Sequence, residues 1–245
     1  MKFLWQRLMM KKLKKEDKTM KILLLNGSPK GKNSGTLLIA EAFIEGMKKD
    51  GDYEVEQLDI QQLEIKPCLG CFHCWNKTPG ECVIKDDMKE GLQKFLAADV
   101  IIWSFPLYYF SMPSQIKAFM DRLLPLNTGK MILVDGRAIH PARHNLAKQY
   151  VLISSCGFPN LEHNYEALTK QFELVFGPGV TSILCAEGPM LKIKEAAPVV
   201  RPYLMKVMNA GMEYAQNKCL GKQTIASLQE LMIPSEMYTK LSSME

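Results

Sequence analysis

The chain has no long unbroken apolar run, although 47% of its 245 residues are hydrophobic. Its longest apolar stretch lies between Val100 and Pro113, and this stretch is interrupted by Ser104, Pro106 and Ser111. A helix that crosses a bilayer needs about 20 predominantly apolar residues in succession. We therefore expect no membrane span, and we expect the hydrophobic residues to fill the core of one domain with an insertion or tail.

Residues 20–245 carry no formal net charge. Residues 1–19 hold seven basic and two acidic side chains, which accounts for the whole formal net charge of +5. The remaining body is neutral and gives no indication of nucleic-acid binding. We interpret residues 1–19 as a disordered or non-native extension, because Met20 stands directly before the first predicted strand. The alternative is an amphipathic helix that lies on an acidic membrane surface.

A secretory signal is also missing, since the apolar part of residues 1–19 is short and no cleavage site follows it. Seven cysteines are an odd number, and without a signal they do not indicate a disulfide framework. We therefore expect a cytoplasmic protein whose thiols are reduced.

Two common nucleotide-binding patterns are missing from the loop after the first predicted strand. The segment from Lys21 to Thr36 reads KILLLNGSPKGKNSGT, and it contains neither GxxxxGK[ST] nor GxGxxG. It does contain an apolar run, a small-residue loop and the start of a helix pattern. Free N–H groups and the helix dipole favour an anion at such a junction. The segment predicts a site for a single phosphate, such as that of flavin mononucleotide (FMN); an ordinary strand-to-helix turn is the alternative.

Strand and helix patterns alternate along the rest of the chain. Amphipathic stretches separate five predicted strands, at residues 22–25, 53–60, 99–104, 149–154 and 180–186. This alternation is typical of a doubly wound α/β fold, and we predict a five-stranded parallel sheet with helices on both faces. The predicted domain spans residues 20–217, with an insertion at 124–148. Residues 218–245 are predicted to be a tail and a possible oligomer arm.

Three predicted loops meet at the carboxyl ends of the strands, where doubly wound sheets bind their ligands. They comprise residues 27–36, 105–112 and 155–159. Loop 105–112 carries three consecutive aromatic residues, which form a stiff apolar wall on which a planar ring can lie. Ser155 and Gly157 are placed on the opposite rim. The alternative is that the aromatic side chains seal an edge of the core.

The sequences GSPKGKNSGT and PLYYFSMPSQIKAFMDR resemble those of the flavodoxin-like NAD(P)H-dependent FMN reductases, over roughly residues 20–217. The resemblance implies a flavodoxin-like fold and an enzyme without an indispensable catalytic side chain, because FMN carries the chemistry. Electrons would pass from NAD(P)H through FMN to a small acceptor, such as a quinone or a nitro compound. A homodimer or homotetramer is implied as well. The implied cofactor-binding residues are Ser28, Lys30, Asn33, Ser34, Gly35 and Thr36 for the phosphate, Pro106, Leu107, Tyr108, Tyr109 and Phe110 for the ring, and Ser155, Cys156 and Gly157 for the third rim.

A cysteine loop at residues 66–84 gives a second chemical signal. Cys68, Cys71, Cys74 and Cys82 have the spacing C-x2-C-x2-C-x7-C, and four thiolates in one short loop can ligate a [4Fe–4S] cluster. The spacing resembles that of the iron–sulfur flavoproteins, a branch of the same fold, which implies an electron carrier reduced by ferredoxin. Free or reversibly paired thiols and a zinc site are the alternatives. With free thiols the protein would be a flavin-dependent redox sensor.

His140 and His144 have the spacing of two residues on one face of a helix. No carboxylate or cysteine stands next to them in the sequence. We therefore interpret them as surface residues and not as metal ligands.

Overall fold

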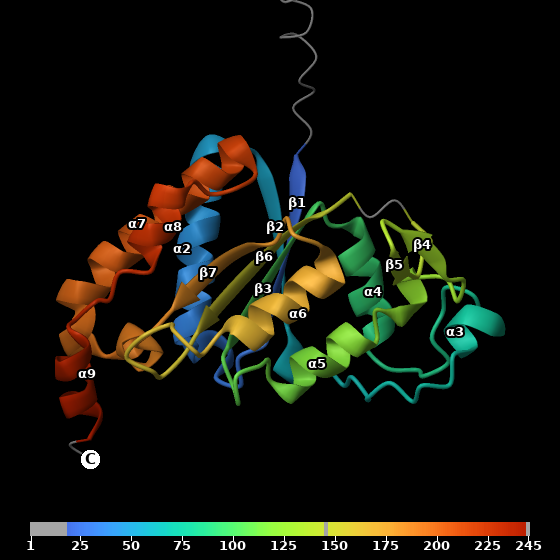
Figure 1. Ribbon diagram of the computed structural model, residues 1–245, viewed down its shortest axis with the longest axis horizontal. Coiled ribbons are helices and arrows are strands. Elements are labelled where there is room, and N and C mark those ends of the chain that lie inside the picture. Colours follow the sequence, from blue (N-terminus) through green and yellow to red (C-terminus); the bar gives the residue numbers. More distant parts are fainter. Residues whose placement is uncertain (1–18, 145–146, 244–245) are drawn as a thin grey trace, which may run out of the picture.

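A five-stranded parallel sheet lies at the centre of the computed structural model, which describes residues 19–144 and 147–243 (Figure 1). The strand order is β2-β1-β3-β6-β7, which confirms the predicted doubly wound fold. Apart from Thr19, the predicted basic extension lies outside the described residues. The strands are β1 (Met20–Asn26), β2 (Tyr53–Asp59), β3 (Val100–Pro106), β6 (Gln149–Ser155) and β7 (Thr181–Cys185).

The apolar run of β1 is explained by burial on both faces of the sheet. Ile22 and Leu24 pack into one core cluster, whereas Leu23 and Leu25 pack into the other, because successive side chains of a strand point to opposite faces. Figure 1 shows the helices in two layers that match these clusters. The layer over the first cluster contains α2 (Gly35–Asp50) and α7 (Ala197–Asn217), and the layer over the second contains α4 (Met88–Ala97), α5 (Ser114–Asp121) and α6 (Glu166–Phe176).

Helices α2 and α7 touch through their backbones. A Cβ atom on Gly46 would lie 1.9 Å from the carbonyl oxygen of Met208, and one on Gly211 would lie 2.0 Å from that of Phe43. Both glycines are therefore needed for close packing. Among residues 19–144 and 147–243, no helix is long and apolar enough to cross a membrane.

Residues 124–148 include a short antiparallel hairpin that the sequence did not predict. Strands β4 (Ile132–Val134) and β5 (Arg137–Ile139) are joined by Asp135 and Gly136, which both have positive φ. Asp-Gly is a typical two-residue hairpin turn. The idea that His140 and His144 share a helical face is wrong, because neither residue is helical.

The C-terminal tail folds back onto its own chain. It contains α8 (Lys222–Leu228) and α9 (Ser235–Ser242), and the side chains of Leu228 and Tyr238 are buried in the first core cluster. Contact of this tail with a second copy, and the homo-oligomer itself, stay predictions. The short elements that complete the fold are α3 (His73–Asn76) and the 3-10 helices Gly31–Asn33, Ile60–Gln62, Leu124–Leu126, Gly188–Lys192 and Lys194–Ala196.

Candidate functional site

The first loop is organised by Asn26, the buried last residue of β1. Its Nδ2 donates to Asp59 Oδ1 at 2.7 Å and to the carbonyl oxygen of Gly31 at 3.3 Å, while its Oδ1 accepts from the Ser28 N–H at 3.3 Å. Helix α2 begins after Ser34, whose Oγ accepts from the Leu37 N–H at 3.2 Å. Such a cap leaves other first-turn N–H groups free for a ligand at the helix start.

Ser155 joins the three predicted loops. Its Oγ lies 2.5 Å from Oγ1 of Thr36 in the first loop, and its carbonyl oxygen accepts from the Leu107 N–H of the second loop at 2.8 Å. Both contacts follow from the parallel sheet, which ends β3 and β6 side by side at Pro106 and Ser155. Residues that lie far apart in sequence therefore form one site at the carboxyl ends of the strands.

The aromatic loop is a tight turn with strained backbone. Tyr108 and Ser111 exchange two backbone hydrogen bonds of 2.9 Å. Between them, Tyr109 (φ 46°) and Phe110 (φ 60°) are both left-handed, which costs about 1–2 kcal/mol for a residue with a Cβ. Phe110 stacks on Phe158 of the third loop with ring centroids 5.9 Å apart, whereas the Tyr109 side chain is fully exposed. The turn therefore directs only part of the predicted aromatic wall towards the site.

Residues 186–189, which follow β7, form a fourth loop that sequence reasoning missed. Gly188 donates its N–H to the carbonyl oxygen of Cys156 at 2.7 Å, and a Cβ on Gly188 would lie only 2.9 Å from that same oxygen. Glycine is therefore required for this approach. The available signal was the dipeptide of Gly188 and Pro189 shortly after the fifth strand, at the edge where ligands bind.

These loops enclose a hollow of about 190 Å³. Every predicted cofactor-binding residue lines it except Asn33, Tyr109 and Phe110, and Gly188 and Pro189 are added. Among its described lining residues, Lys30 is the one charged side chain, so the hollow favours an anion. The lining combines the hydroxyl groups of Ser28, Ser34, Thr36 and Ser155 with the apolar groups of Pro106 and Leu107. Such a lining suits a ligand with a phosphate and a flat ring.

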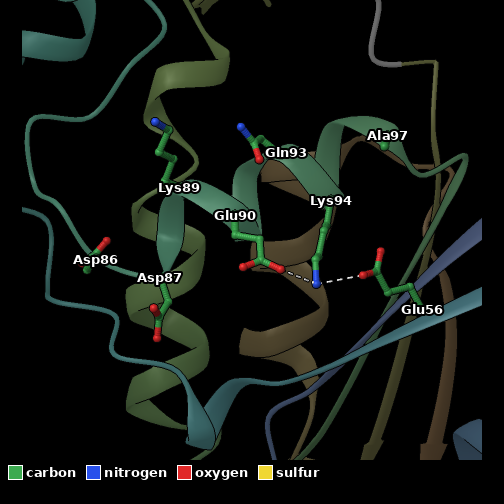
Figure 2. Close-up of a pocket in the computed structure, with 8 residues that line it drawn as sticks. All are labelled: Glu56, Asp86, Asp87, Lys89, Glu90, Gln93, Lys94 and Ala97. Carbon is green, nitrogen blue, oxygen red and sulfur yellow. Dashed lines mark ion pairs between the residues drawn. The ribbon is translucent and has the colours of Figure 1, made fainter.

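A larger hollow of about 650 Å³ lies along α4 and carries a different chemistry (Figure 2). Lys94 points between Glu90 and Glu56, with Nζ–Oε1 distances of 2.7 and 2.8 Å. Hydrogen bonds with Glu56 and Glu90 raise the pKa of Lys94. None of the described residues that line this hollow belongs to the four loops. We therefore place the candidate site at the strand ends.

The four thiols of the cysteine loop differ in their exposure. Cys68 and Cys71 are exposed, Cys74 is buried and Cys82 is half-buried. Burial raises the pKa of Cys74, and the charges of Cys82, Cys68 and Cys71 raise it further. In the part of the chain that the structure describes, however, no three potential ligands are arranged to hold a metal ion. The predicted metal site is therefore not preformed.

A buried ion pair closes the base of the cysteine loop. Arg122 donates to both carboxylate oxygens of Asp86, at 2.7 and 2.9 Å, and to the carbonyl oxygen of Lys66 at 2.7 Å. Burial opposes ionisation of Asp86, but hydrogen bonds from Arg122, Lys66 and Met88 outweigh it and lower its pKa. Burial opposes the charge of Arg122, but the hydrogen bond with Asp86 and the charges of Cys82 and Asp86 outweigh it and raise its pKa. The buried Nε of Arg122 has no hydrogen-bond partner among the described residues.

The insertion at 124–148 packs on the cysteine loop. Trp75 of α3 donates its Nε1–H to the carbonyl oxygen of Leu124 at 3.0 Å, and the His140 ring lies 4.7 Å from the Trp75 ring. Arg143 donates to the carbonyl oxygen of Cys74 at 3.3 Å. The insertion thus covers one side of the four-cysteine segment.

The sequence is similar to those of known flavoproteins. The chain is 38% identical over 110 residues to an iron–sulfur flavoprotein of Methanocaldococcus jannaschii, a match that covers 45% of this chain and 55% of that protein. It is 25% identical over 170 residues to an FMN-dependent NADH:quinone oxidoreductase of Pseudoalteromonas atlantica, covering 66% and 82% of the two chains. The matches span about half the length of the iron–sulfur flavoproteins.

A solved structure and a family model define the fold. The structure of an FMN-dependent NADH-azoreductase from Bacillus anthracis in complex with FMN superposes with a TM-score of 0.59 at 17% identity, covering 80% of this chain and all of that one. The family model for the flavodoxin-like fold matches residues 20–178. Because this match covers well over half of the chain, the chain belongs to the flavodoxin-like fold family.

Proposed function

We propose that the protein is an FMN-dependent oxidoreductase that passes electrons from NAD(P)H through bound FMN to a small acceptor. The observation that carries this proposal is the hollow at the strand ends, whose lining combines a small-residue loop at a helix start with apolar side chains. The relatives that are FMN-dependent NADH:quinone oxidoreductases support the nicotinamide donor and a quinone-like acceptor.

The residues of the hollow fit FMN by their chemistry. Ser28, Ser34 and Thr36 would donate hydrogen bonds to the phosphate, and Lys30 would balance part of its charge. Pro106, Leu107 and Tyr108 would hold the ring, while the backbone at Gly157 and Gly188 would approach it closely. When bound, FMN supplies the chemistry, since it accepts a hydride and releases single electrons. The chain's own part is to bind and orient the cofactor.

An anaerobic titration tests this function. Purified protein should bind FMN, and NADH or NADPH should then bleach the yellow flavin absorption. Ser34→Ala removes both the cap of α2 and a phosphate donor, so it should raise the Kd for FMN about tenfold or more. Ser114→Ala is the matched control, because Ser114 is exposed at the start of α5 and lies outside the hollow. Failure of FMN to bind would refute the proposal, as would bound FMN that neither nicotinamide reduces.

A second candidate function is an iron–sulfur flavoprotein electron carrier reduced by ferredoxin. The relatives at 38% identity are iron–sulfur flavoproteins, and the buried Nε of Arg122, which has no partner among the described residues, suits a negatively charged sulfur group. Cys68, Cys71, Cys74 and Cys82 would hold the [4Fe–4S] cluster after a shift of this loop. The cluster would supply single-electron transfer within the flavin domain.

Metal analysis after anaerobic preparation separates the alternatives for the cysteine loop. If the protein is an iron–sulfur electron carrier, it should contain four irons per chain. Cys71→Ser should then lose most of this iron, because one of the four ligands is removed. Cys219→Ser is the control, since Cys219 is exposed and lies outside the loop. One zinc per chain would identify a zinc site. Metal-free protein with thiols that oxidise reversibly would identify a redox sensor.

A further inference from the structure

The C-terminal tail is fastened directly to the third loop of the candidate site. Tyr238 of α9, which is only 6% exposed, donates its hydroxyl hydrogen to the carbonyl oxygen of Gly157 at 3.0 Å. Ser235 donates to the carbonyl oxygen of Pro159 at 3.2 Å. Gly157 lines the hollow, so Tyr238 of the tail bonds directly to a residue of the site's lining.

A second attachment runs through Glu187, a carboxylate that is 1% exposed. Its Oε2 accepts from the Met232 N–H at 2.7 Å, and its Oε1 accepts from the Ile233 N–H at 3.3 Å. Burial raises the pKa of Glu187, and these two N–H donors oppose that rise. A buried carboxylate without such donors would be costly, so tail docking and the position of Glu187 depend on each other.

The two attachment points of the tail, at Gly157 and Glu187, lie on loops that are hydrogen-bonded to each other. The Glu187 N–H donates to the carbonyl oxygen of Phe158 at 3.0 Å, and the Gly188 N–H donates to that of Cys156 at 2.7 Å. These bonds tie the third and fourth loops together. Glu187 has a left-handed backbone (φ 58°), which a residue with a Cβ adopts at a cost. The conformation is held by contacts on both sides, and the tail provides those to the carboxylate.

We infer that residues 231–238 support the third and fourth loops of the FMN site, and that Glu187 and Tyr238 are positioning residues that couple docking of this segment to FMN binding. The inference rests on the proposed FMN function. The segment lies beyond residues 20–178, which the family model matches. Without the segment, the third and fourth loops would have to be ordered when FMN binds, which would weaken affinity.

Titration of FMN into conservative variants tests the positioning role. Tyr238→Phe removes only the hydroxyl, and Glu187→Gln leaves one of the two backbone N–H groups without an acceptor. Each should raise the Kd for FMN about three- to tenfold, the range expected for one buried hydrogen bond. Thr239→Ala is the control, because Thr239 is exposed on α9 and bonds only within that helix.

Hydrogen exchange in the wild-type protein gives a readout that does not depend on the variants. Because coupling is reciprocal, FMN should slow exchange of the Met232 and Ile233 amides more than that of the Ile225 amide, which bonds within α8. Equal protection of all three amides, together with an unchanged Kd in both variants, would overturn the inference and leave FMN binding intact. A wild-type protein that does not bind FMN would overturn the proposed function and this inference together.

Discussion

Replacing Arg122 with methionine should lower the free energy of unfolding by about 3–5 kcal/mol, the range for breaking a buried ion pair by removing one partner. The Arg122 and Asp86 side chains are 1% and 0% exposed, so the Asp86 carboxylate would be left buried without its main donor. The carbonyl oxygen of Lys66 would also lose its donor. Methionine is chosen because it keeps much of the apolar volume, so the loss reports the charge and hydrogen bonds.

Urea denaturation of the Arg122 variant should be compared with that of Lys117→Met. Lys117 lies on α5, which ends directly before Arg122, and pairs with Asp121 at 2.6 Å, but both side chains are 45% exposed. An exposed pair of this kind contributes about 1 kcal/mol or less. If the two variants lost similar stability, the buried pair would not be what holds the base of the cysteine loop.

Gly46→Ala should lower the free energy of unfolding by about 2–3 kcal/mol, the upper part of the range for overpacking a core. Alanine favours the helical state by about 1 kcal/mol, but its Cβ would lie 1.9 Å from the Met208 carbonyl oxygen. The clash is with backbone and not with a flexible side chain. Helices α2 and α7 must therefore move apart, and the contact at Gly211 must open with them.

Thermal and urea unfolding of Gly46→Ala would measure this effect. Gly179→Ala is the control, because a Cβ at Gly179 meets no atom within 4 Å. We expect the control to unfold within about 0.5 kcal/mol of the wild type, as most surface substitutions do. A Gly46 variant that matched the control would show that the two helices separate at little cost.

Local patterns predicted the parts of the fold that depend on local physics. The apolar run of β1 and the small-residue loop after it identify a strand and a helix start, because burial and capping require particular residue types within a few positions. The carboxyl-edge rule then brought Thr36, Pro106 and Ser155 together without any structural information. Tyr109 was assigned to the site for its residue type, but the direction of its side chain depends on two left-handed residues that the sequence does not indicate.

Contacts between distant residues were beyond the reach of the sequence. Glu187 and Met232 are 45 positions apart, and no period or spacing connects them. The same holds for Arg122 and Asp86, which are 36 positions apart. The arrangement of the four cysteines also depends on packing against residues 124–148, so their spacing alone predicted their chemistry but not their geometry.

The distance along the chain between Gly157 and its partner Tyr238 has a consequence for biosynthesis. A ribosome that adds 5–20 residues per second needs about 4–16 s to cover these 81 residues. Once Cys185 has been added, partway through that interval, the nascent chain holds all five strands of the sheet. However, Gly157 and Glu187 still lack their hydrogen-bond partners in the tail, which have not yet been synthesised. Capture of a cofactor by the nascent chain should therefore lag behind folding of the sheet.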